Sequence, residues 1–387
     1  MHKTTKDFLI IAFLTIGVTF LIWLPHLLAL PSFWGLNFSN GFATIYRNFD
    51  GLEYVIIAKT WYDPNLIASV PQLLPANYFA SHFPGYSILI ALFAPVLGFL
   101  KSMLLLSVGS TVLAAWVFYL LVKDFRLSSH PLILTALFLI LPARWLIVHS
   151  VGSSEPTFIF FILAAVYSFM RFEQSRKALF IILTGLAGFA AQITRPPGIL
   201  LFIAFGFFIV WRMISQKMQF TSIIRIIGKY SLLIFIPLAL LAVFFWYSLT
   251  YQDFWAYFKS GDNIHLTLPP FQVFNINQFW VGDIWLEDIV YIFILGFLGG
   301  IMLWKQKLYP MAFFVLTYLL ASILIAHRDI SRYVLPITPF VLIAFEKVLT
   351  SKEFKIILPI ILVAIYLYAQ NFILSNTAPI PNIELFD

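Results

Sequence analysis

The chain has 387 residues, of which 61% are hydrophobic and only 11% are charged. That composition excludes an ordinary soluble domain, in which about 25% of residues carry a charge. The absence of cysteine excludes a disulfide framework, a thiolate metal site and a cysteine nucleophile. The net charge of +7 has to be divided between the two sides of a membrane before it indicates any partner, and it does not indicate nucleic-acid binding.

Apolar runs with the length of transmembrane helices recur along almost the whole chain. We therefore predict an all-α fold, a polytopic transmembrane helical bundle of about 11 spans plus a short re-entrant or interfacial helix. One membrane domain is expected over 1–373, followed by a short tail over 374–387. The expected spans are 8–30, 102–122, 131–148, 156–170, 178–193, 197–211, 230–250, 288–304, 308–326, 333–348 and 355–373.

The topology depends on the short apolar stretch 86–100, which Pro95 and Gly98 interrupt. If this stretch does not cross the membrane, 16 of the 24 basic residues lie in the cytoplasm and 12 of the 17 acidic residues lie outside, as the positive-inside rule favours. The large polar loops 31–85 and 251–287 then face the extracytoplasmic side. Because the sequence has no Gly-rich phosphate loop, we expect any chemistry on that side. The membrane is expected to be the plasma membrane of a prokaryote, or the endoplasmic reticulum of a eukaryote.

The first polar loop contains a pair of acids, Asp50 and Glu53, three residues apart. On a helix both carboxylates would lie on one face, near Tyr54. Such a pair at a bilayer surface can activate a hydroxyl or bind a divalent cation such as Mg²⁺ or Mn²⁺. The alternative is a solvated loop acid followed by an interfacial helix. His82, which precedes Pro84, is a candidate substrate ligand or a turn residue.

Glu155 is the second candidate carboxylate, and it follows the small residues Ser153 and Ser154. A carboxylate among small residues at the mouth of a span leaves room for a ligand. The alternative is structural, because Ser-Ser-Glu-Pro is also typical of the start of a helix.

Three arginines lie at the expected outer interface. Arg195 is followed by Pro-Pro-Gly between two apolar spans, where it would bind a lipid phosphate or reach to the interface as a structural residue. Arg328 and Arg332 are four residues apart, so on one helical turn they could clamp a phosphate. Asp329 between them offers the alternative of a salt bridge.

The loop 251–287 combines aromatic and acidic side chains with His265. Sugar-binding surfaces use this combination, and an aromatic belt at a membrane surface looks the same. His265 is therefore a candidate substrate ligand.

Five short motifs follow one another in this chain. Phe49–Ala58 matches W-D-[SG]-x-x-[YF]-x-x-I-A with Phe for the Trp, and Phe83–Tyr86 and Ala94–Gly98 match an F-P-x-Y-P-like start and an A-P-x-x-G end of a short helix. Ser154–Pro156 matches S-E-[SP], Thr194–Gly198 matches T-R-x-x-G, and Arg332, Tyr333 and Pro339 match R-Y-x-x-x-x-x-P. In their order and spacing they resemble the GT-C superfamily of integral membrane glycosyltransferases. The resemblance extends over roughly residues 40–345 and is greatest to PIG-V-like (GPI-anchor mannosyltransferase II-like) proteins and their bacterial relatives.

The resemblance implies a GT-C-like fold and inverting transfer of a sugar, mannose or a related hexose, from a polyprenyl- or dolichyl-phosphate donor to an extracytoplasmic acceptor. It implies that Asp50 is the general base and that Glu155 is a second acid that positions the acceptor or the sugar. The resemblance implies that Arg195 and Arg332 bind the donor phosphate, and Arg328 is a third candidate from its spacing to Arg332. The further substrate-binding candidates are Glu53, Tyr54, His82, His265 and Tyr333.

Two alternatives to this function stay open. A flippase or transporter of lipid-linked sugars would place charges within the membrane and often shows repeated halves, whereas here the charges gather at one face. An O-antigen-type ligase or polymerase would use paired arginines in a late loop, and 251–287 contains no arginine. The acceptor would be a lipid, a glycan or a protein. If a divalent cation is required, Asp50 and Glu53 are its candidate ligands.

Overall fold

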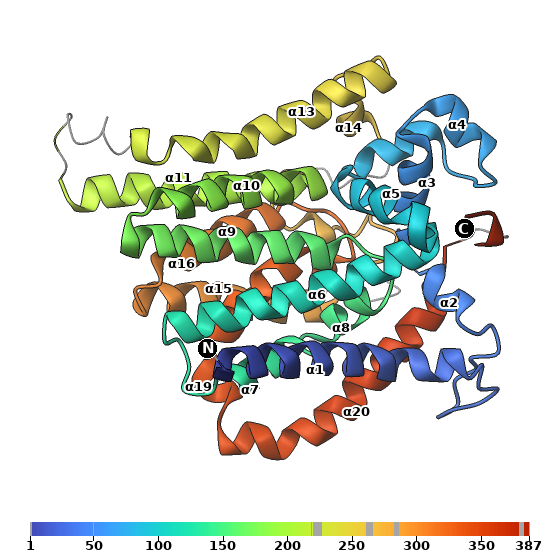
Figure 1. Ribbon diagram of the computed structural model, residues 1–387, viewed down its shortest axis with the longest axis horizontal. Coiled ribbons are helices and arrows are strands. Elements are labelled where there is room, and N and C mark those ends of the chain that lie inside the picture. The colour runs from blue at the N-terminus through green and yellow to red at the C-terminus, as the bar shows by residue number, and fades with distance from the viewer. Residues whose placement is uncertain are drawn as a thin grey trace. The chain divides into compact units, whose positions relative to one another are not determined.

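The computed structural model describes residues 2–48, 50–217, 219, 227–260, 266–281, 286–378 and 383–386. Within these residues the chain forms α-helices and short 3₁₀ helices, and it contains three isolated bridges but no strand (Figure 1). The predicted all-α fold class is confirmed. The helices group into two compact units, and the division between the units falls within α9 and α13. The expected single membrane domain over 1–373 stays a prediction.

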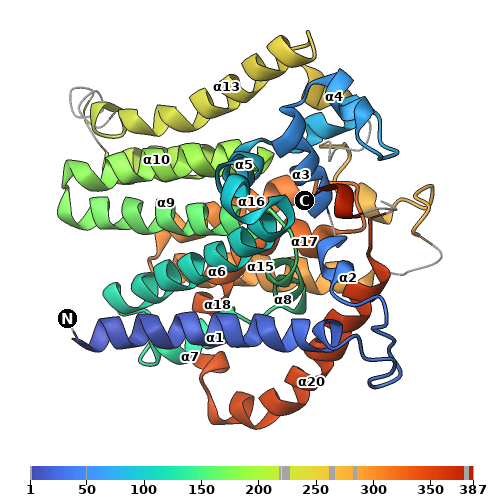
Figure 2. The same cartoon turned by 45° about the vertical axis from the view of Figure 1, so that its right-hand side comes forward.

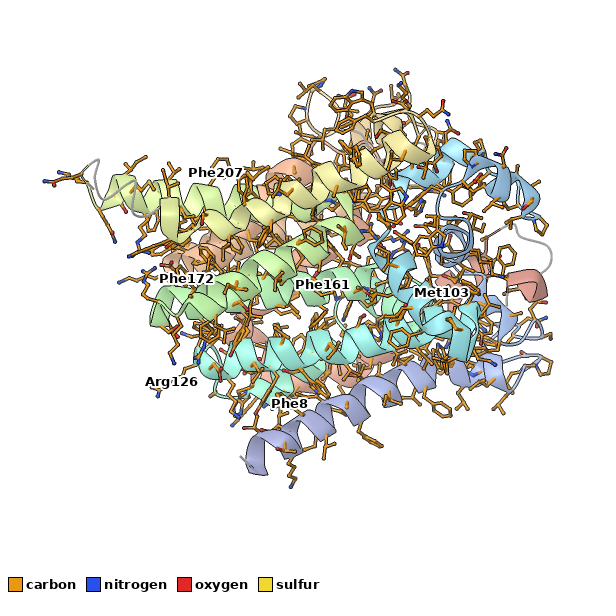
Figure 3. The ribbon with its side chains drawn as sticks, turned by 45° about the horizontal axis from the view of Figure 1, so that its top comes forward. Phe8, Met103, Arg126, Phe161, Phe172 and Phe207 are labelled. Atoms are coloured by element: carbon orange, nitrogen blue, oxygen red, sulfur yellow. The ribbon has the colours of Figure 1, made fainter. Side chains whose placement is uncertain are left out.

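Unit 1 comprises residues 1–160, 242–262 and 346–387. Within it α1 and α6 lie side by side in both views (Figures 1 and 2), with the Phe8 and Trp116 rings 5.3 Å apart. Met103 lies near the start of α6 and Arg126 lies just past its end (Figure 3). Unit 1 contains α1 (His2–Leu27), α2 (Ala43–Tyr46), α3 (Gly51–Thr60), α4 (Pro64–Ser69), η1 (Ala76–Ser81), α5 (Gly85–Leu97), α6 (Phe99–Asp124), α7 (Pro131–Phe138), α8 (Ala143–Ser150), the start of α9 (Glu155–Ser175), the end of α13 (Phe235–Thr250), α14 (Ala256–Lys259), α19 (Glu346–Leu349), α20 (Lys352–Ser375) and η6 (Ile383–Phe386).

Unit 2 comprises residues 161–241 and 263–345. Its helices pack through aromatic rings and close glycine contacts: the Phe169 and Phe205 rings stack 4.1 Å apart, and a Cβ on Gly300 would meet the side chain of Leu316 at 2.7 Å. Beyond the rest of α9 and α13, it contains α10 (Ala178–Thr194), η2 (Pro196–Gly198), α11 (Ile199–Ser215), η3 (Ser231–Ile234), η4 (Gln272–Phe274), α15 (Glu287–Lys305), α16 (Tyr309–Ser322), α17 (Ile330–Tyr333), η5 (Leu335–Ile337) and α18 (Thr338–Ala344).

Among the described residues, seven helices are long and apolar enough to cross a membrane, or eight if a bent pair is one span. Many of their large side chains are exposed, as lipid-facing residues are: Phe207 on α11 is one example (Figure 3). The spans expected at 178–193, 308–326 and 333–348 correspond to shorter apolar helices. The number of eleven therefore stays a prediction.

The span expected over 131–148 is not one straight helix. α7 and α8 meet at a bend of 71°. Pro142 lies at the bend. Proline breaks a helix here because it has no N–H to donate and its ring obstructs the preceding helical turn.

α5 is the short helix predicted over 86–100. Its 13 residues reach about 20 Å, which is less than the hydrocarbon core of a bilayer. The chain then reverses into α6 at Gly98, whose φ of +80° favours glycine. Whether α5 enters the membrane or lies on its surface stays a prediction.

Candidate functional site

The candidate site in unit 1 begins at the first residue before α3. Asp50 occupies the N-cap position, where a carboxylate commonly accepts a backbone N–H, but here its side chain makes no capping bond. Instead Oδ2 lies 3.6 Å from Nε2 of His82, and the Asp50 side chain is 31% exposed. The carboxylate is therefore partly accessible and adjacent to an imidazole.

Gly51 lets the start of α3 approach the turn that precedes α9. A Cβ at this position would lie 2.8 Å from the carbonyl oxygen of Gly152 and 2.8 Å from the sulfur of Met103. A backbone oxygen cannot give way as a flexible side chain can, so this approach requires glycine. The glycine after Asp50 in the sequence motif thus has a packing role.

His82 follows η1 and is held at its ring and at its carbonyl. The ring packs edge-on against Tyr54, with centroids 5.1 Å apart. The hydroxyls of Tyr62 and Tyr247 donate to the His82 carbonyl oxygen at 2.6 and 3.4 Å. Burial raises the pKa of the Tyr62 phenol well above its ordinary value, so the phenol stays a donor. These contacts keep His82 in place beside Asp50.

A hydroxyl network joins α3 to the start of α9. The Tyr54 hydroxyl is 2.8 Å from Ser154 Oγ. Ser153 donates from Oγ to the carboxylate of Glu155, and its N–H donates to Ser107 Oγ at 3.2 Å. Glu155 is only 1% exposed. A buried carboxylate that accepts from a neutral hydroxyl can position a polar ligand without a large rearrangement.

Contacts therefore run from Asp50 to His82, on to Tyr54 and to the serines beside Glu155. The structure brings these predicted residues together within unit 1. Glu53 lies on the same helix as Tyr54 and is buried.

The predicted site residues of unit 2 lie at three places. Arg195 caps the end of α10 in an extended conformation and is partly buried. Arg332 lies on α17 and is 6% exposed, whereas Arg328 is exposed, with its guanidinium 5.6 Å from the ring of Phe279. Arg328 precedes α17, so the two arginines do not share the helical turn that their spacing suggested.

Two further candidates complete the comparison with the sequence. The ring of Tyr333 packs against His327 at 5.3 Å, and its carbonyl accepts the Tyr318 hydroxyl at 3.0 Å. His265 lies outside the described residues.

The described residues contain no group of three or more histidines and acids placed to hold a metal ion. Asp50 and Glu53 belong to no such group, and their role as ligands of a divalent cation stays a prediction.

Several residues of the site were missed in the sequence. Ser81 contacts Nδ1 of His82 at 2.8 Å, and Tyr86 donates to the carbonyl of Met103 and lies 2.8 Å from Ser107 Oγ. Tyr86 lies within the F-P-x-Y motif, which marked its position but not its role. Tyr62 and Tyr247 are separated from His82 by 20 and 165 residues, and no local pattern predicts such contacts.

No protein-family model matches the chain, and no curated protein matches its sequence. Solved structures do match. The crystal structure of ArnT from Cupriavidus metallidurans bound to undecaprenyl phosphate is 12% identical, with a TM-score of 0.57 over 91% of this chain and 63% of that one. The structure of the same protein in the apo state is also 12% identical, with a TM-score of 0.53 over 86% of this chain and 59% of that one.

The archaeal oligosaccharyltransferase AglB from Archaeoglobus fulgidus, in complex with an inhibitory peptide and a dolichol-phosphate, is 13% identical, with a TM-score of 0.51 over 98% of this chain and 56% of that one. This chain thus spans 56–63% of the length of these proteins. ArnT and AglB are GT-C membrane glycosyltransferases. At this identity the likeness defines the fold: the chain is an integral multi-pass membrane protein with a GT-C-like helical fold.

Proposed function

We propose that the chain is an inverting glycosyltransferase that moves a sugar, mannose or a related hexose, from a polyprenyl- or dolichyl-phosphate donor to an acceptor outside the cytoplasm. The observation that carries the proposal is the partly exposed Asp50 carboxylate beside His82, on a GT-C-like fold. The lipid phosphates bound to ArnT and AglB support the class of donor. This support is an analogy of fold, so the reaction rests on the residues of the site.

Asp50 is the general base. Its carboxylate accepts the proton of the acceptor hydroxyl while that oxygen attacks the anomeric carbon from the face opposite the phosphate. The bond from the anomeric carbon to the phosphate oxygen breaks, and the electron pair leaves with the lipid phosphate. A partly exposed carboxylate at a helix start suits this role, because the acceptor has to reach it.

Glu155 positions the sugar or the acceptor. Its carboxylate is buried and held by the Ser153 hydroxyl, so its geometry is fixed before a substrate binds. A preorganised acceptor of hydrogen bonds costs no reorganisation during the reaction. Glu53, Tyr54, His82, His265 and Tyr333 are the further substrate-binding candidates.

Arg195, Arg328 and Arg332 bind the donor phosphate in this proposal. A guanidinium forms paired hydrogen bonds with phosphate oxygens and stabilises the charge that grows as the glycosidic bond breaks. Arg332 is the most deeply buried of the three candidates, with 6% of its surface exposed.

The test is sugar transfer by the purified protein, given a panel of polyprenyl-phosphate sugars and crude membrane lipid as the acceptor source. We expect the protein to consume one donor and to release the lipid phosphate together with a glycosylated product. If no donor is consumed and the intact lipid-linked sugar crosses proteoliposomes instead, the protein is a transporter and the proposal is wrong.

A further inference from the structure

The hydrogen bonds of Ser81 determine which nitrogen of His82 carries a proton. A serine hydroxyl has a single proton, and Ser81 donates it to the carbonyl oxygen of Tyr78 at 2.7 Å. The same Oγ lies 2.8 Å from Nδ1 of His82, and with its proton directed to Tyr78 it accepts there. The hydrogen-bond network therefore assigns the proton of the neutral imidazole to Nδ1.

It follows that Nε2 of the neutral imidazole presents a lone pair, and this lone pair faces the Asp50 carboxylate. The two atoms are 3.6 Å apart, beyond the range of a hydrogen bond. Two acceptors that face each other attract only when a proton lies between them. The pair is therefore arranged to take up one proton and to contract around it.

We propose that His82 is the proton relay partner of Asp50, receiving at Nε2 the proton that Asp50 removes from the acceptor hydroxyl. The inference rests on the proposed function and deepens it. His82 acts through Asp50 and is a positioning residue, distinct from the base itself.

The relay balances in atoms and charge. The acceptor O–H bond breaks as its oxygen bonds to the anomeric carbon, and the proton passes to Asp50 Oδ2 and then to His82 Nε2. The result is an imidazolium beside a carboxylate, an ion pair that stabilises the product state. The proton leaves to water after the product dissociates, which restores the neutral imidazole.

The described groups that contact the ring leave Asp50 as the proton source at neutral pH. Besides Asp50 at Nε2 and Ser81 at Nδ1, the ring meets the rings of Tyr54 and Tyr78, with centroids at 5.1 and 5.5 Å. Both of these contacts join ring to ring, and the Tyr54 hydroxyl lies 2.8 Å from Ser154 Oγ. The hydroxyls of Tyr62 and Tyr247 are engaged at the carbonyl of His82.

The first test is spectroscopic and requires no activity. In protein labelled with ¹⁵N-histidine, the His82 signals are identified by their loss in His82→Gln, and the nitrogen shifts of the neutral ring report its tautomer. We expect the proton on Nδ1, and we expect Ser81→Ala to weaken that preference. A neutral ring with its proton on Nε2 overturns the relay, because Nε2 would then be unable to accept.

The second test is kinetic. We expect His82→Gln to lower kcat for sugar transfer about tenfold while KM for donor and acceptor stays constant, because the relay acts only when the proton moves. His130→Gln is the matched control, since His130 is an exposed residue at the start of α7, and it should retain full activity. An unchanged kcat in His82→Gln, or a rise in KM alone, contradicts the relay.

The two tests separate failure of the relay from failure of the proposed function. If the wild-type protein transfers no sugar, the proposed function fails, and the relay in sugar transfer fails with it. If the wild type transfers sugar and Asp50→Asn does not, but the neutral ring carries its proton on Nε2, the function stands and the relay is wrong.

Discussion

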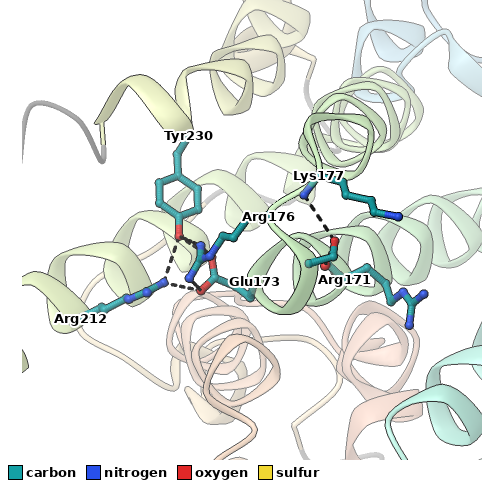
Figure 4. Close-up of polar contacts among 7 residues, drawn as sticks. Arg171, Glu173, Arg176, Lys177, Arg212 and Tyr230 are labelled. Atoms are coloured by element: carbon teal, nitrogen blue, oxygen red, sulfur yellow. Dashed lines mark hydrogen bonds and ion pairs between the residues drawn. The ribbon is translucent and has the colours of Figure 1, made fainter.

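The two ends of α9 each carry a glutamate in a different environment. Glu155 at the first residue is 1% exposed and accepts a hydrogen bond from the neutral Ser153 hydroxyl. Glu173 in the last turns, with a side chain 16% exposed, is bound by two guanidiniums and a phenol (Figure 4). Arg176 donates to both of its oxygens, at 2.9 and 3.2 Å, and Arg212 and Tyr230 complete the set.

Under the proposed function Glu155 positions a substrate, whereas the contacts of Glu173 are structural. The contacts of Glu173 tie the ends of α9 and α11 to the residue before η3, and both of its oxygens are used. Such a set stabilises its neighbours and has little capacity left for a ligand. Glu155 instead lies in the hydroxyl network that reaches Tyr54 and, through His82, Asp50. Loss of the Glu155 charge should therefore lower sugar transfer, whereas loss of the Glu173 charge should lower the stability of the fold.

Of the variants that compare the two ends of α9, Glu155→Gln is expected to have the larger effect on transfer. The amide keeps the volume of the side chain and an oxygen that can accept from Ser153, so we expect a smaller loss in the free energy of unfolding than for Glu173→Gln. The loss of the negative charge should lower the rate of sugar transfer about 100-fold, which is the lower range for a positioned acid or base. Transfer assays and thermal melts on the same preparation check both parts. A large drop in the melting temperature with normal transfer would make Glu155 structural.

Glu173→Gln should have the opposite effect. Two guanidiniums would then face each other without their shared carboxylate, and we expect a loss of about 2 kcal/mol in the free energy of unfolding, less than for a fully buried pair because the Arg176 side chain is 40% exposed. Transfer measured well below the melting temperature should be unchanged. Glu353→Gln on the exposed first turn of α20 is the matched control, and it should change neither the free energy of unfolding nor the transfer rate.

Gly51→Ala tests whether the start of α3 has to approach Gly152 closely. The added methyl meets a backbone oxygen, so we expect a cost of about 1.5 kcal/mol and a lower transfer rate as Asp50 moves. Gly109→Ala on α6, where a Cβ meets nothing within 4 Å, should be neutral or slightly stabilising. Equal melting temperatures and equal rates for the two variants would contradict the close packing.

The smallest effect concerns Tyr230 at alkaline pH. Burial raises the pKa of its phenol from 10.0 to about 12. The stability that this shift contributes is complete below pH 10 and is lost as the pH rises towards 12, because the unfolded chain ionises first. Tyr230→Phe should therefore lose less stability than the wild type between these values, as measured by thermal melts. An identical loss in both proteins would exclude a contribution from Tyr230.

Much of the fold could be predicted because it depends on local composition. The long apolar runs predict helices, and α5 was predicted short from Pro95 and Gly98 alone. The bend between α7 and α8 was missed, although Pro142 marks it, because the apolar run continues through the break. The hydropathy of a segment says little about whether its helix is straight.

The site was predicted in part, for a similar reason. The order of the motifs indicated Asp50, Tyr54 and Glu155, and His82 was a candidate from its position before Pro84. The structure places these four residues in one set of contacts. The tyrosines that hold the His82 carbonyl come from distant segments, and only the fold reveals them. The spacing of Arg328 and Arg332 suggested a shared helical turn, but α17 begins after Arg328.

The central claim is that Asp50 is the base for transfer from a lipid-phosphate sugar. Its most direct test is the transfer rate of Asp50→Asn beside Asp63→Asn, which removes the same charge from the same loop. Asp63 only caps α4, at 2.8 and 3.3 Å from two backbone nitrogens, and asparagine caps equally well. We predict that Asp50→Asn lowers transfer at least about 100-fold with an unchanged melting temperature, and that Asp63→Asn transfers at the wild-type rate. Wild-type transfer by folded Asp50→Asn would contradict the claim.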